Sequence, residues 1–421
     1  MSNATTHIKT EKRSAERSRS KLVPALRFSE FEGEWNPSKL GAVTKYVKGF
    51  AFKSDDYQDN GVRIIRVSDL AADRIKTDND KLYIDEQKAL DFDKYKLRTG
   101  NIVITTVGSK PEMIESAVGR GIYIHNDDEG LLNQNMLKFE NIEGISNGFI
   151  IGLINSRRYQ HYMKGIARGN ANQANITVVD LLQYNISCPQ LPEQQKIASF
   201  LSAVDEKIQQ ITKKKALLEQ YKKGVMQQLF PSTGSGQRSG QLRFKDANGK
   251  AYPDWEDTLL GDCLKYVQPT KYLVSSTEYD NSFETPVLTA GKTFVLGYTD
   301  EKENICTDYP LIIFDDFTTA SKYVDFPFKA KSSAMKLLLA KEGVDVKFMF
   351  EAMQNIKFEV GGHGRHWISI FSQLVVSVPS INEQQKIATY LSSIDNKIEA
   401  VNNQITQTQT FKKGLLQQMF V

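Results

Sequence analysis

The chain has 421 residues, of which 40% are hydrophobic and 25% charged, as is typical of an ordinary soluble globular protein with two or more domains. No apolar run is long enough to cross a bilayer and no signal peptide is recognisable, which excludes a membrane-spanning protein and favours a cytoplasmic one. Cys188, Cys263 and Cys306 lie far apart, which fits a reducing compartment and argues against a zinc module.

The first segment, residues 1–21, is a polar and basic tail that we expect to be disordered. It holds six Lys or Arg residues against two Glu residues, a surplus that equals the formal net charge of +4 of the whole chain. The rest of the chain is therefore formally neutral, so a nucleic-acid binder of this composition must gather its Lys and Arg in local patches. We favour a solubilising tail over a DNA-binding arm.

Residues 22–190 are predicted to form the first globular domain. Runs rich in β-branched residues predict strands at 62–67, 101–107 and 117–125. A helix with an apolar face is predicted over 148–167, and an edge-like strand over 185–189. Strands followed by a late helix indicate an α+β domain.

Residues 191–230 carry a clear helical periodicity. Apolar residues recur at alternating steps of four and three from Ile197 to Leu229, interrupted only at Lys215 and Lys222. This spacing predicts a long helix with a coiled-coil seam. Asp205 is a candidate N-cap, which predicts a break between a short helix from Glu193 and a longer arm; the alternative for Asp205 is a solvated helix face.

Residues 231–241 are predicted to be a linker, since they are rich in Ser and Gly. Residues 242–380 then form a second globular domain, with strands expected at 286–289 and 311–314. A helix is expected over 344–356 and a final strand over 374–378. The order of elements is the same as in the first domain.

Residues 381–421 repeat the helical segment. Residues 193–230 and 383–420 align without a gap, and 17 of 38 positions are identical, so the chain contains an internal duplication. Asp395 takes the place of Asp205. Neither helix can bury its apolar stripe alone, and we favour an antiparallel pair over separate packing of each helix on its own domain.

The duplication extends to the edges of the two globular segments. Residues 40–47 and 260–267 share five of eight positions, and Trp35 matches Trp255 at the same offset. Arg27 and Arg243 recur within Leu-Arg-Phe triplets, whereas the middles of the two segments do not align. We predict an α+β protein with two globular α/β domains, separated by two long helices in an antiparallel coiled coil with a pseudo-twofold internal repeat.

Catalytic motifs are incomplete. Gly291-Lys292-Thr293 resembles the end of a P-loop, but Pro286 stands where the leading glycine is required. His363 and His366 are not joined by other residues at metal-ligand spacing. We therefore predict no catalytic residue, metal or cofactor, and treat a self-contained nuclease or methyltransferase as the least favoured alternative.

The duplicated EQQKIA…LS…D.KI…KKG…QQ.F motif, at mid-chain and at the C-terminal end, resembles that of the specificity subunits of type I restriction-modification systems. The resemblance covers nearly all of residues 22–421. It implies two target-recognition domains that each read one half of a split site in double-stranded DNA. It further implies a non-catalytic chain whose repeated helices dock two methyltransferase subunits and, through them, ATP-dependent restriction endonuclease (translocase) subunits.

Amide-rich and basic loops are the candidate DNA contacts, because amides pair with adenine, and Arg with guanine or phosphate. Polar residues at the ends of predicted strands are further candidates. The alternative for all of these residues is that they stabilise turns. The candidates are Thr106, Ser109, Lys110, Arg168, Asn170, Asn172, Gln173, Asn175, Lys292, Thr293, Thr318, Lys322, Tyr323, His363, Arg365, His366 and Trp367.

The methyltransferase-docking surface is predicted on an exposed face at the start of each repeat. Its residues are Glu193, Gln194, Gln195, Lys196, Glu383, Gln384, Gln385 and Lys386. The alternative is that these residues cap and solubilise the helix start. A coiled-coil scaffold without DNA specificity is the alternative function for the whole chain.

Overall fold

The computed structural model describes residues 22–71, 73–111, 118–170, 173–230, 240–291, 293–356 and 366–421. They divide into two compact units, of which unit 1 comprises Met1–Ile211 and Gln404–Val421, and unit 2 comprises Thr212–Asn403. The expected tail at 1–21 and linker residues 231–239 lie outside the described residues.

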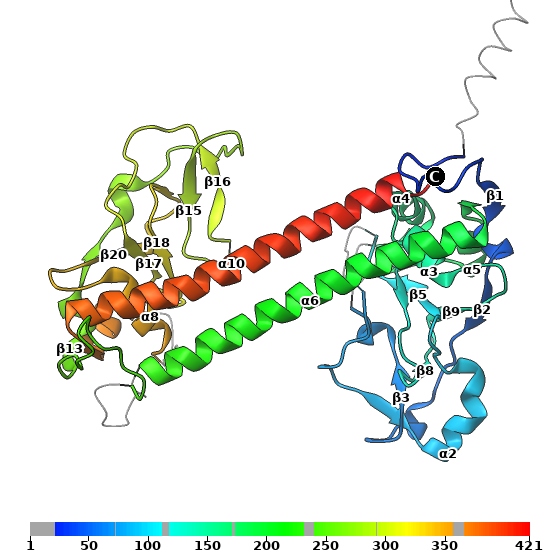
Figure 1. The fold of residues 1–421 in the computed structure, drawn as a ribbon, viewed down its shortest axis with the longest axis horizontal. Helices are drawn as coiled ribbons and strands as arrows, with labels where there is room; N and C mark the ends of the chain where they lie inside the picture. Colours follow the sequence, from blue (N-terminus) through cyan, green and yellow to red (C-terminus); the bar gives the residue numbers. More distant parts are fainter. Residues whose placement is uncertain are drawn as a thin grey trace, which may run out of the picture. The chain divides into compact units, whose positions relative to one another are not determined.

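Unit 1 is built on a four-stranded antiparallel sheet (Figure 1). Its inner strand β5 is buried on both faces. Ile102 and Ile104 of β5 pack in the same core as α3 (Asn147–Ile154), while Val103 faces a second core beneath the neighbouring sheet. This burial explains why β5 reads as an uninterrupted apolar run. In order, the sheet contains β2 (Lys45–Lys48), β9 (Met136–Glu140), β5 (Ile102–Thr105) and β7 (Gly121–Tyr123).

Smaller elements complete unit 1. The predicted strands at 62–67 and 185–189 appear as β3 and β12, and the strand predicted at 117–125 contains β7. The predicted helix at 148–167 is two helices, because Ser156 accepts a hydrogen bond from the Tyr159 backbone and begins a new one. The elements are β1 (Asn36–Lys39) paired with β12 (Asn185–Cys188), the sheet of β4 (Leu82–Ile84), β3 (Val62–Ile65) and β8 (Leu131–Leu132), and the helices α2 (Glu86–Ala89), α3 (Asn147–Ile154), α4 (Arg157–Ile166) and α5 (Val178–Leu182).

Unit 2 follows the same plan. Phe348 of α8 packs in one core with Ile312, Phe314 and Leu338 of a four-stranded sheet. The elements are the sheet β14 (Leu264–Val267), β20 (Met335–Ala340), β17 (Leu311–Asp315), β18 (Ser321–Val324); the sheet β16 (Val295–Thr299), β15 (Thr285–Leu288), β19 (Lys329–Ala330); the pair β13 (Glu256–Leu259) and β21 (Val375–Val378); and α7 (Leu260–Cys263), α8 (Val346–Gln354) and α9 (His366–Ser369).

Two long helices, α6 (Leu191–Leu229) and α10 (Ile381–Gln418), each contribute to both units. In unit 2, Lys215 donates to Asn402 and Lys222 pairs with Asp395, so residue numbers rise along one helix as they fall along the other. In unit 1, Asp205 accepts from Lys412, while Leu201 and Phe420 lie together against Gly152. The predicted antiparallel packing is confirmed within each unit.

The helix breaks predicted at Asp205 and Asp395 are wrong. Both residues lie inside uninterrupted helices, and neither caps a helix start. Their carboxylates instead pair with lysines, Asp205 with Lys412, and Asp395 with Lys222 at 2.7 Å and Lys347 at 3.1 Å. The lysines that interrupt the apolar seam are therefore accommodated by ion pairs or hydrogen bonds.

No helix in the described ranges combines the length and apolarity needed to cross a membrane.

Candidate functional site

A buried carboxylate fixes the start of α6 in unit 1. Glu193 is 2% exposed and accepts hydrogen bonds from Arg27 Nε at 2.8 Å and Arg27 Nη2 at 2.7 Å. It also accepts one from Trp35 Nε1 at 3.1 Å. The hydrogen bond to Glu193 is the largest cause of the raised pKa of Arg27. Because the pair is bidentate and joined to a buried indole, it sets the position of the helix start against the N-terminal segment.

Unit 2 repeats this arrangement. Glu383 is 0% exposed and accepts from Arg243 Nη2 at 2.7 Å and from Trp255 Nε1 at 3.2 Å. We call these two sets of residues, Arg27–Trp35–Glu193 and Arg243–Trp255–Glu383, the anchors. Their identical chemistry indicates that the edges shared by the two globular segments serve to hold the repeated helices.

The glutamine after each anchor carboxylate is also structural. Gln194 accepts from the Ser146 backbone at 3.0 Å and donates to the Pro189 carbonyl at 2.9 Å. Gln384 makes the matching contacts with the Asp345 backbone at 2.8 Å and the Pro379 carbonyl at 2.9 Å. Each glutamine thus ties the first turn of a long helix to the start of α3 or α8.

The exposed docking face predicted at the helix starts must be corrected. Four of the eight predicted residues are buried and hydrogen-bonded within their own units: Glu193, Gln194, Glu383 and Gln384. They therefore do not lie on an exposed face. The other four are exposed: Gln195, Lys196, Gln385 and Lys386. Lys196 pairs loosely with Glu30 at 3.4 Å.

Two candidate DNA-contacting segments of unit 1 meet in one small sheet. The strands β10 (Arg168–Gly169), β11 (Ala174–Asn175) and β6 (Val107–Gly108) pair in the order β10-β11-β6. The register places Asn175 opposite both Arg168 and Val107. The structure therefore brings together residues that the sequence separates by some 60 positions.

Most described candidates in this sheet are exposed. Lys110, Arg168, Asn170, Gln173 and Asn175 lie at the surface. Thr106 is half-buried, and Ser109 is 7% exposed, so its side chain is largely removed from the surface.

Local contacts already occupy part of this surface. Arg168 pairs with Asp180 at 3.0 Å, and Asn170 accepts from the Gln173 backbone at 2.8 Å. Part of the amide content is therefore turn chemistry. Asn172 lies outside the described residues.

The candidate DNA-contacting residues of unit 2 do not all lie at the surface. Trp367 is 2% exposed, its backbone N–H donates to Asp316 Oδ1 at 2.9 Å, and its ring packs 5.4 Å from that of Phe314. It is therefore a core residue, and its prediction as a surface contact is wrong in this structure. Asp315 caps the turn before β18 by accepting from the Phe317 backbone at 2.9 Å.

The remaining candidates of unit 2 are scattered. Thr318 and Lys322 are exposed, while Tyr323 is half-buried, and burial raises the pKa of its hydroxyl. Thr293 is exposed in the loop between β15 and β16, which belongs to a different sheet from β17 and β18. Lys292, His363, Arg365 and the side chain of His366 lie outside the described residues.

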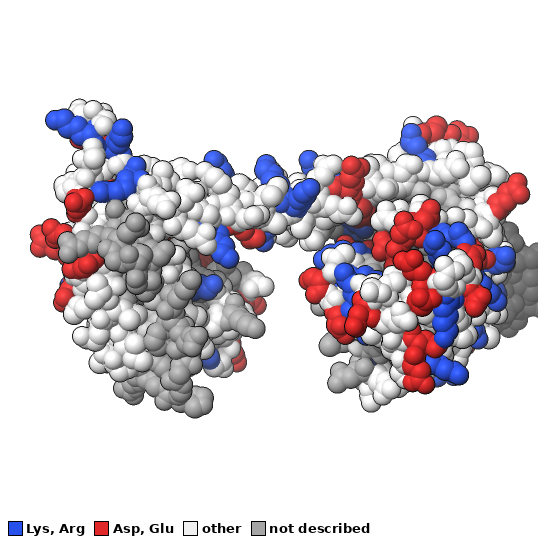
Figure 2. All heavy atoms as spheres, turned by 90° about the horizontal axis from the view of Figure 1, so that it is seen from below, with Lys and Arg blue, Asp and Glu red and all other residues white. Residues whose placement is uncertain are grey.

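Charge on unit 1 is mixed rather than gathered on the face seen in Figure 2, where Lys and Arg alternate with Asp and Glu. That face therefore lacks the uniform basic field of a tight non-specific DNA binder. Across the described residues, no group of three or more His, Cys, Asp or Glu is placed to hold a metal ion.

The sequence alone did not lead us to predict that the anchor residues contact one another. The signal was present, because Arg27, Trp35 and Glu193 all recur as Arg243, Trp255 and Glu383. When residues from distant segments are duplicated together, they can contact one another within each copy. Such a pattern indicates an internal contact as readily as a repeated docking surface.

Comparisons with known proteins agree on one family. Residues 32–220 and 252–408 match the family described as "Type I restriction modification DNA specificity domain". The Escherichia coli EcoR124I/EcoR124II type I restriction enzyme specificity subunit is 42% identical over 163 residues, which cover 37% of this chain and 40% of that protein. A putative type I restriction enzyme MjaX specificity subunit from Methanocaldococcus jannaschii is 25% identical over 92% of this chain and 93% of its own length.

A solved structure shares the fold. The type I restriction-modification S subunit from M. genitalium superposes with a TM-score of 0.62 at 15% identity, covering 95% of this chain and 99% of that one.

Proposed function

Because the chain belongs to the type I restriction modification DNA specificity family, we propose that it recognises DNA through a two-part site, one half read by each globular domain. The domains are those bounded by residues 22–190 and 242–380. The observation that carries the proposal is the pair of identical anchors beneath domains whose middles differ. Two domains that are held in the same way but differ in their middle segments can each recognise a different DNA sequence.

The proposed partners are double-stranded DNA, two methyltransferase subunits and, through these, restriction subunits. In this proposal the chain is non-catalytic and works in the cytoplasm. Each methyltransferase docks near the start of one long helix, where Gln195 and Lys196, or Gln385 and Lys386, remain exposed. The buried glutamates support this surface from beneath and do not contact the partner.

Comparing the methylation pattern of a host with and without this gene tests the function directly. The proposal expects one bipartite motif to lose adenine or cytosine methylation when the gene is removed. An unchanged methylome in a host that expresses the methyltransferase would contradict it. The alternative, a coiled-coil scaffold without DNA specificity, then becomes the better account.

Two methyltransferase subunits are expected to bind one copy of this chain. Native mass spectrometry at saturating methyltransferase measures the ratio. Gln195→Glu/Lys196→Glu and Gln385→Glu/Lys386→Glu are each expected to remove one methyltransferase, because each places negative charge on one of the two equivalent surfaces. Binding of a single methyltransferase to the unmodified chain would rule out two equivalent docking surfaces.

Removing two amides from the small sheet of unit 1 is expected to relax one half of the DNA site. Gln173→Ala/Asn175→Ala takes away two exposed hydrogen-bonding side chains, and a lost base contact costs about 1–3 kcal/mol of discrimination. Competition binding with base-substituted duplexes gives the selectivity at each position. Asn126→Ala/Gln210→Ala, which removes exposed amides elsewhere in unit 1, is the matched control; equal effects of the two variants would exclude specific reading by this sheet.

A further inference from the structure

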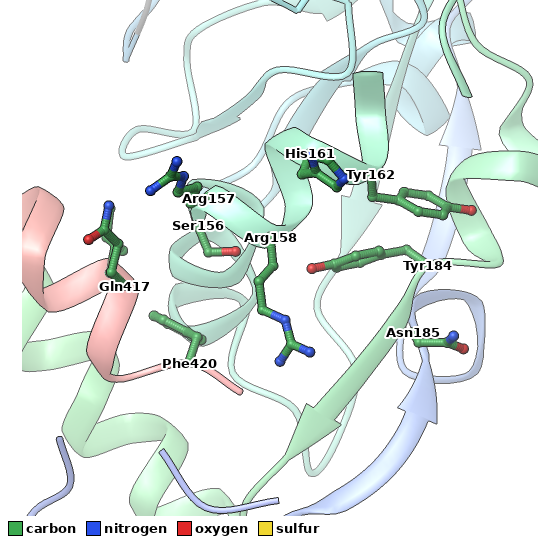
Figure 3. A pocket seen from close by; sticks show the side chains of 10 residues that line it. Ser156, Arg157, Arg158, His161, Tyr162, Tyr184, Asn185, Gln417 and Phe420 are labelled. Carbon is green, nitrogen blue, oxygen red and sulfur yellow. The ribbon is translucent and has the colours of Figure 1, made fainter. Parts of the chain in front are cut away.

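A pocket of about 570 Å³ in unit 1 combines basic and aromatic side chains (Figure 3). Arg157, Arg158 and His161 come from the first turns of α4, and Gln417 comes from the last turn of α10. Tyr184 forms part of the wall. No Asp or Glu lines the pocket, so the two guanidinium groups give it a formal charge of at least +2.

Arg157 and Arg158 are unusual among the arginines of the described residues. Both are exposed, and neither forms an ion pair or a side-chain hydrogen bond within the described part of the chain. Most other described arginines pair with a carboxylate of their own unit: Arg27, Arg66, Arg74, Arg98, Arg168 and Arg243. The two residues are adjacent in sequence, but their guanidinium groups point to different sides of the pocket (Figure 3). Each is therefore available to bind an external anion by itself.

The aromatic wall of the pocket is preformed. The Tyr162 and Tyr184 rings lie 4.9 Å apart, and Tyr184 is 8% exposed. The Tyr162 hydroxyl donates to the Asp180 carbonyl at 2.5 Å, which holds its ring in place. A rigid aromatic wall beside Arg158 strengthens the attraction of its guanidinium for an anion compared with open water.

The pocket and the β10–β11 sheet lie at opposite ends of one helix. α4 has 10 residues and ends two positions before Arg168 of β10. Asp180 also links the aromatic wall of the pocket to β10, since its carbonyl accepts from Tyr162 and its carboxylate pairs with Arg168. A helix of this length spans ~15 Å, which matches about four base pairs of B-DNA at 3.4 Å each.

We propose that the Arg157–Arg158 pocket binds a backbone phosphate of double-stranded DNA, about four base pairs away from the bases contacted by the β10–β11 sheet. This proposal rests on the proposed DNA-reading function of unit 1. A carboxylate of a partner protein is the other source of an anion. Phosphate is favoured because the pocket lies on the helix that leads directly into the sheet and because the N–H groups of a single guanidinium can donate to two oxygens of a phosphate.

The test measures duplex affinity against salt concentration for the chain assembled with its methyltransferase. Arg157→Gln/Arg158→Gln is expected to lower the salt slope by about one phosphate contact and to weaken specific and non-specific duplexes by the same factor. Selectivity between duplexes stays unchanged, because a phosphate carries no base identity. Arg74→Gln/Arg98→Gln, which removes two exposed ion-paired arginines from the same unit, is the control with the same loss of charge.

A scan with neutral methylphosphonate linkages locates the phosphate in the unmodified complex. One position outside the half-site of unit 1 is expected to weaken binding, and the same linkage is expected to have no further effect on Arg157→Gln/Arg158→Gln. If that variant does not fold, the scan alone decides, and the absence of a sensitive linkage there overturns the proposal.

The remaining outcomes separate this proposal from the function on which it rests. An unchanged salt slope in a complex that still selects its site overturns the phosphate assignment and leaves the function standing. If Arg157→Gln/Arg158→Gln loses a methyltransferase in native mass spectrometry but keeps its salt slope, the phosphate assignment is overturned. The pocket then binds a carboxylate of the partner protein. An unmodified complex without site-selective binding overturns the proposed function and the phosphate assignment together.

Discussion

Replacing residues 242–380 with the equivalent segment of a relative is expected to change one half of the methylated DNA site and to leave the other half unchanged. The reason is that the replaced segment contains the sheets and loops of unit 2, while the small sheet of unit 1 stays intact. Sequencing of methylated bases in a host that carries the hybrid reads out both halves at once.

The structure adds a condition to this experiment. Arg243 and Trp255 lie inside the exchanged segment, whereas Glu383, which they hold, lies outside it. A donor segment must therefore supply Arg and Trp at the matching positions. A control hybrid with Arg243→Ala is expected to be less stable in unit 2, because the buried carboxylate of Glu383 loses its cation. A folded hybrid in which both halves change, or neither, would refute one reader per domain.

Removing the anchor carboxylate of unit 2 is expected to give the largest loss of stability from a single substitution. Glu383→Ala leaves the guanidinium of Arg243 and the indole N–H of Trp255 without their acceptor in a buried site. Breaking a buried ion pair from one side costs about 3–5 kcal/mol, and the partial exposure of Arg243, 22%, places the expected loss near the lower end of that range. For a unit of this size the melting temperature should fall by roughly 6–12 °C.

Differential scanning calorimetry measures this effect, and three variants control it. Glu193→Ala is expected to destabilise unit 1 by a similar amount, because its anchor has the same contacts. Trp255→Phe removes only one hydrogen bond and should cost about 1 kcal/mol beyond the change in ring packing. Glu256→Ala, an exposed glutamate of unit 2, should be nearly neutral. If Glu383→Ala melts like Glu256→Ala, the anchor does not stabilise unit 2.

Periodicity was sufficient to predict the long helices and their antiparallel packing. An apolar seam of alternating threes and fours is a local property of the sequence, and it survives two interruptions by lysine. The break at Asp205 was predicted from local capping chemistry, but the pairing with Lys412 overrides it. That pairing joins residues more than 200 positions apart, so no local rule reveals it.

The candidate site was only partly predictable for the same reason. Loop composition found the residues of the β10–β11 sheet, and topology then joined them to β6, two residues before Lys110. Loop composition also made Trp367 a candidate DNA contact, and the repeat placed Glu193 on an exposed face, although Phe314 and Arg27 respectively pack against them from distant parts of the chain. Whether a polar or aromatic residue is exposed or buried depends on its contacts with distant parts of the chain, which the local sequence does not reveal.

The division of unit 1 into two separate stretches of chain has a consequence for its biosynthesis. Leu415, Met419 and Phe420 belong to the same core as Trp35 and Phe149. Residues 22–190 therefore leave the ribosome with a gap in their core, which is filled only after residues 404–421 have been translated. A nonsense codon just before residue 404 should consequently damage the domain formed by residues 22–190, and a chaperone that shields nascent chains should act on this domain until residues 404–421 have been made.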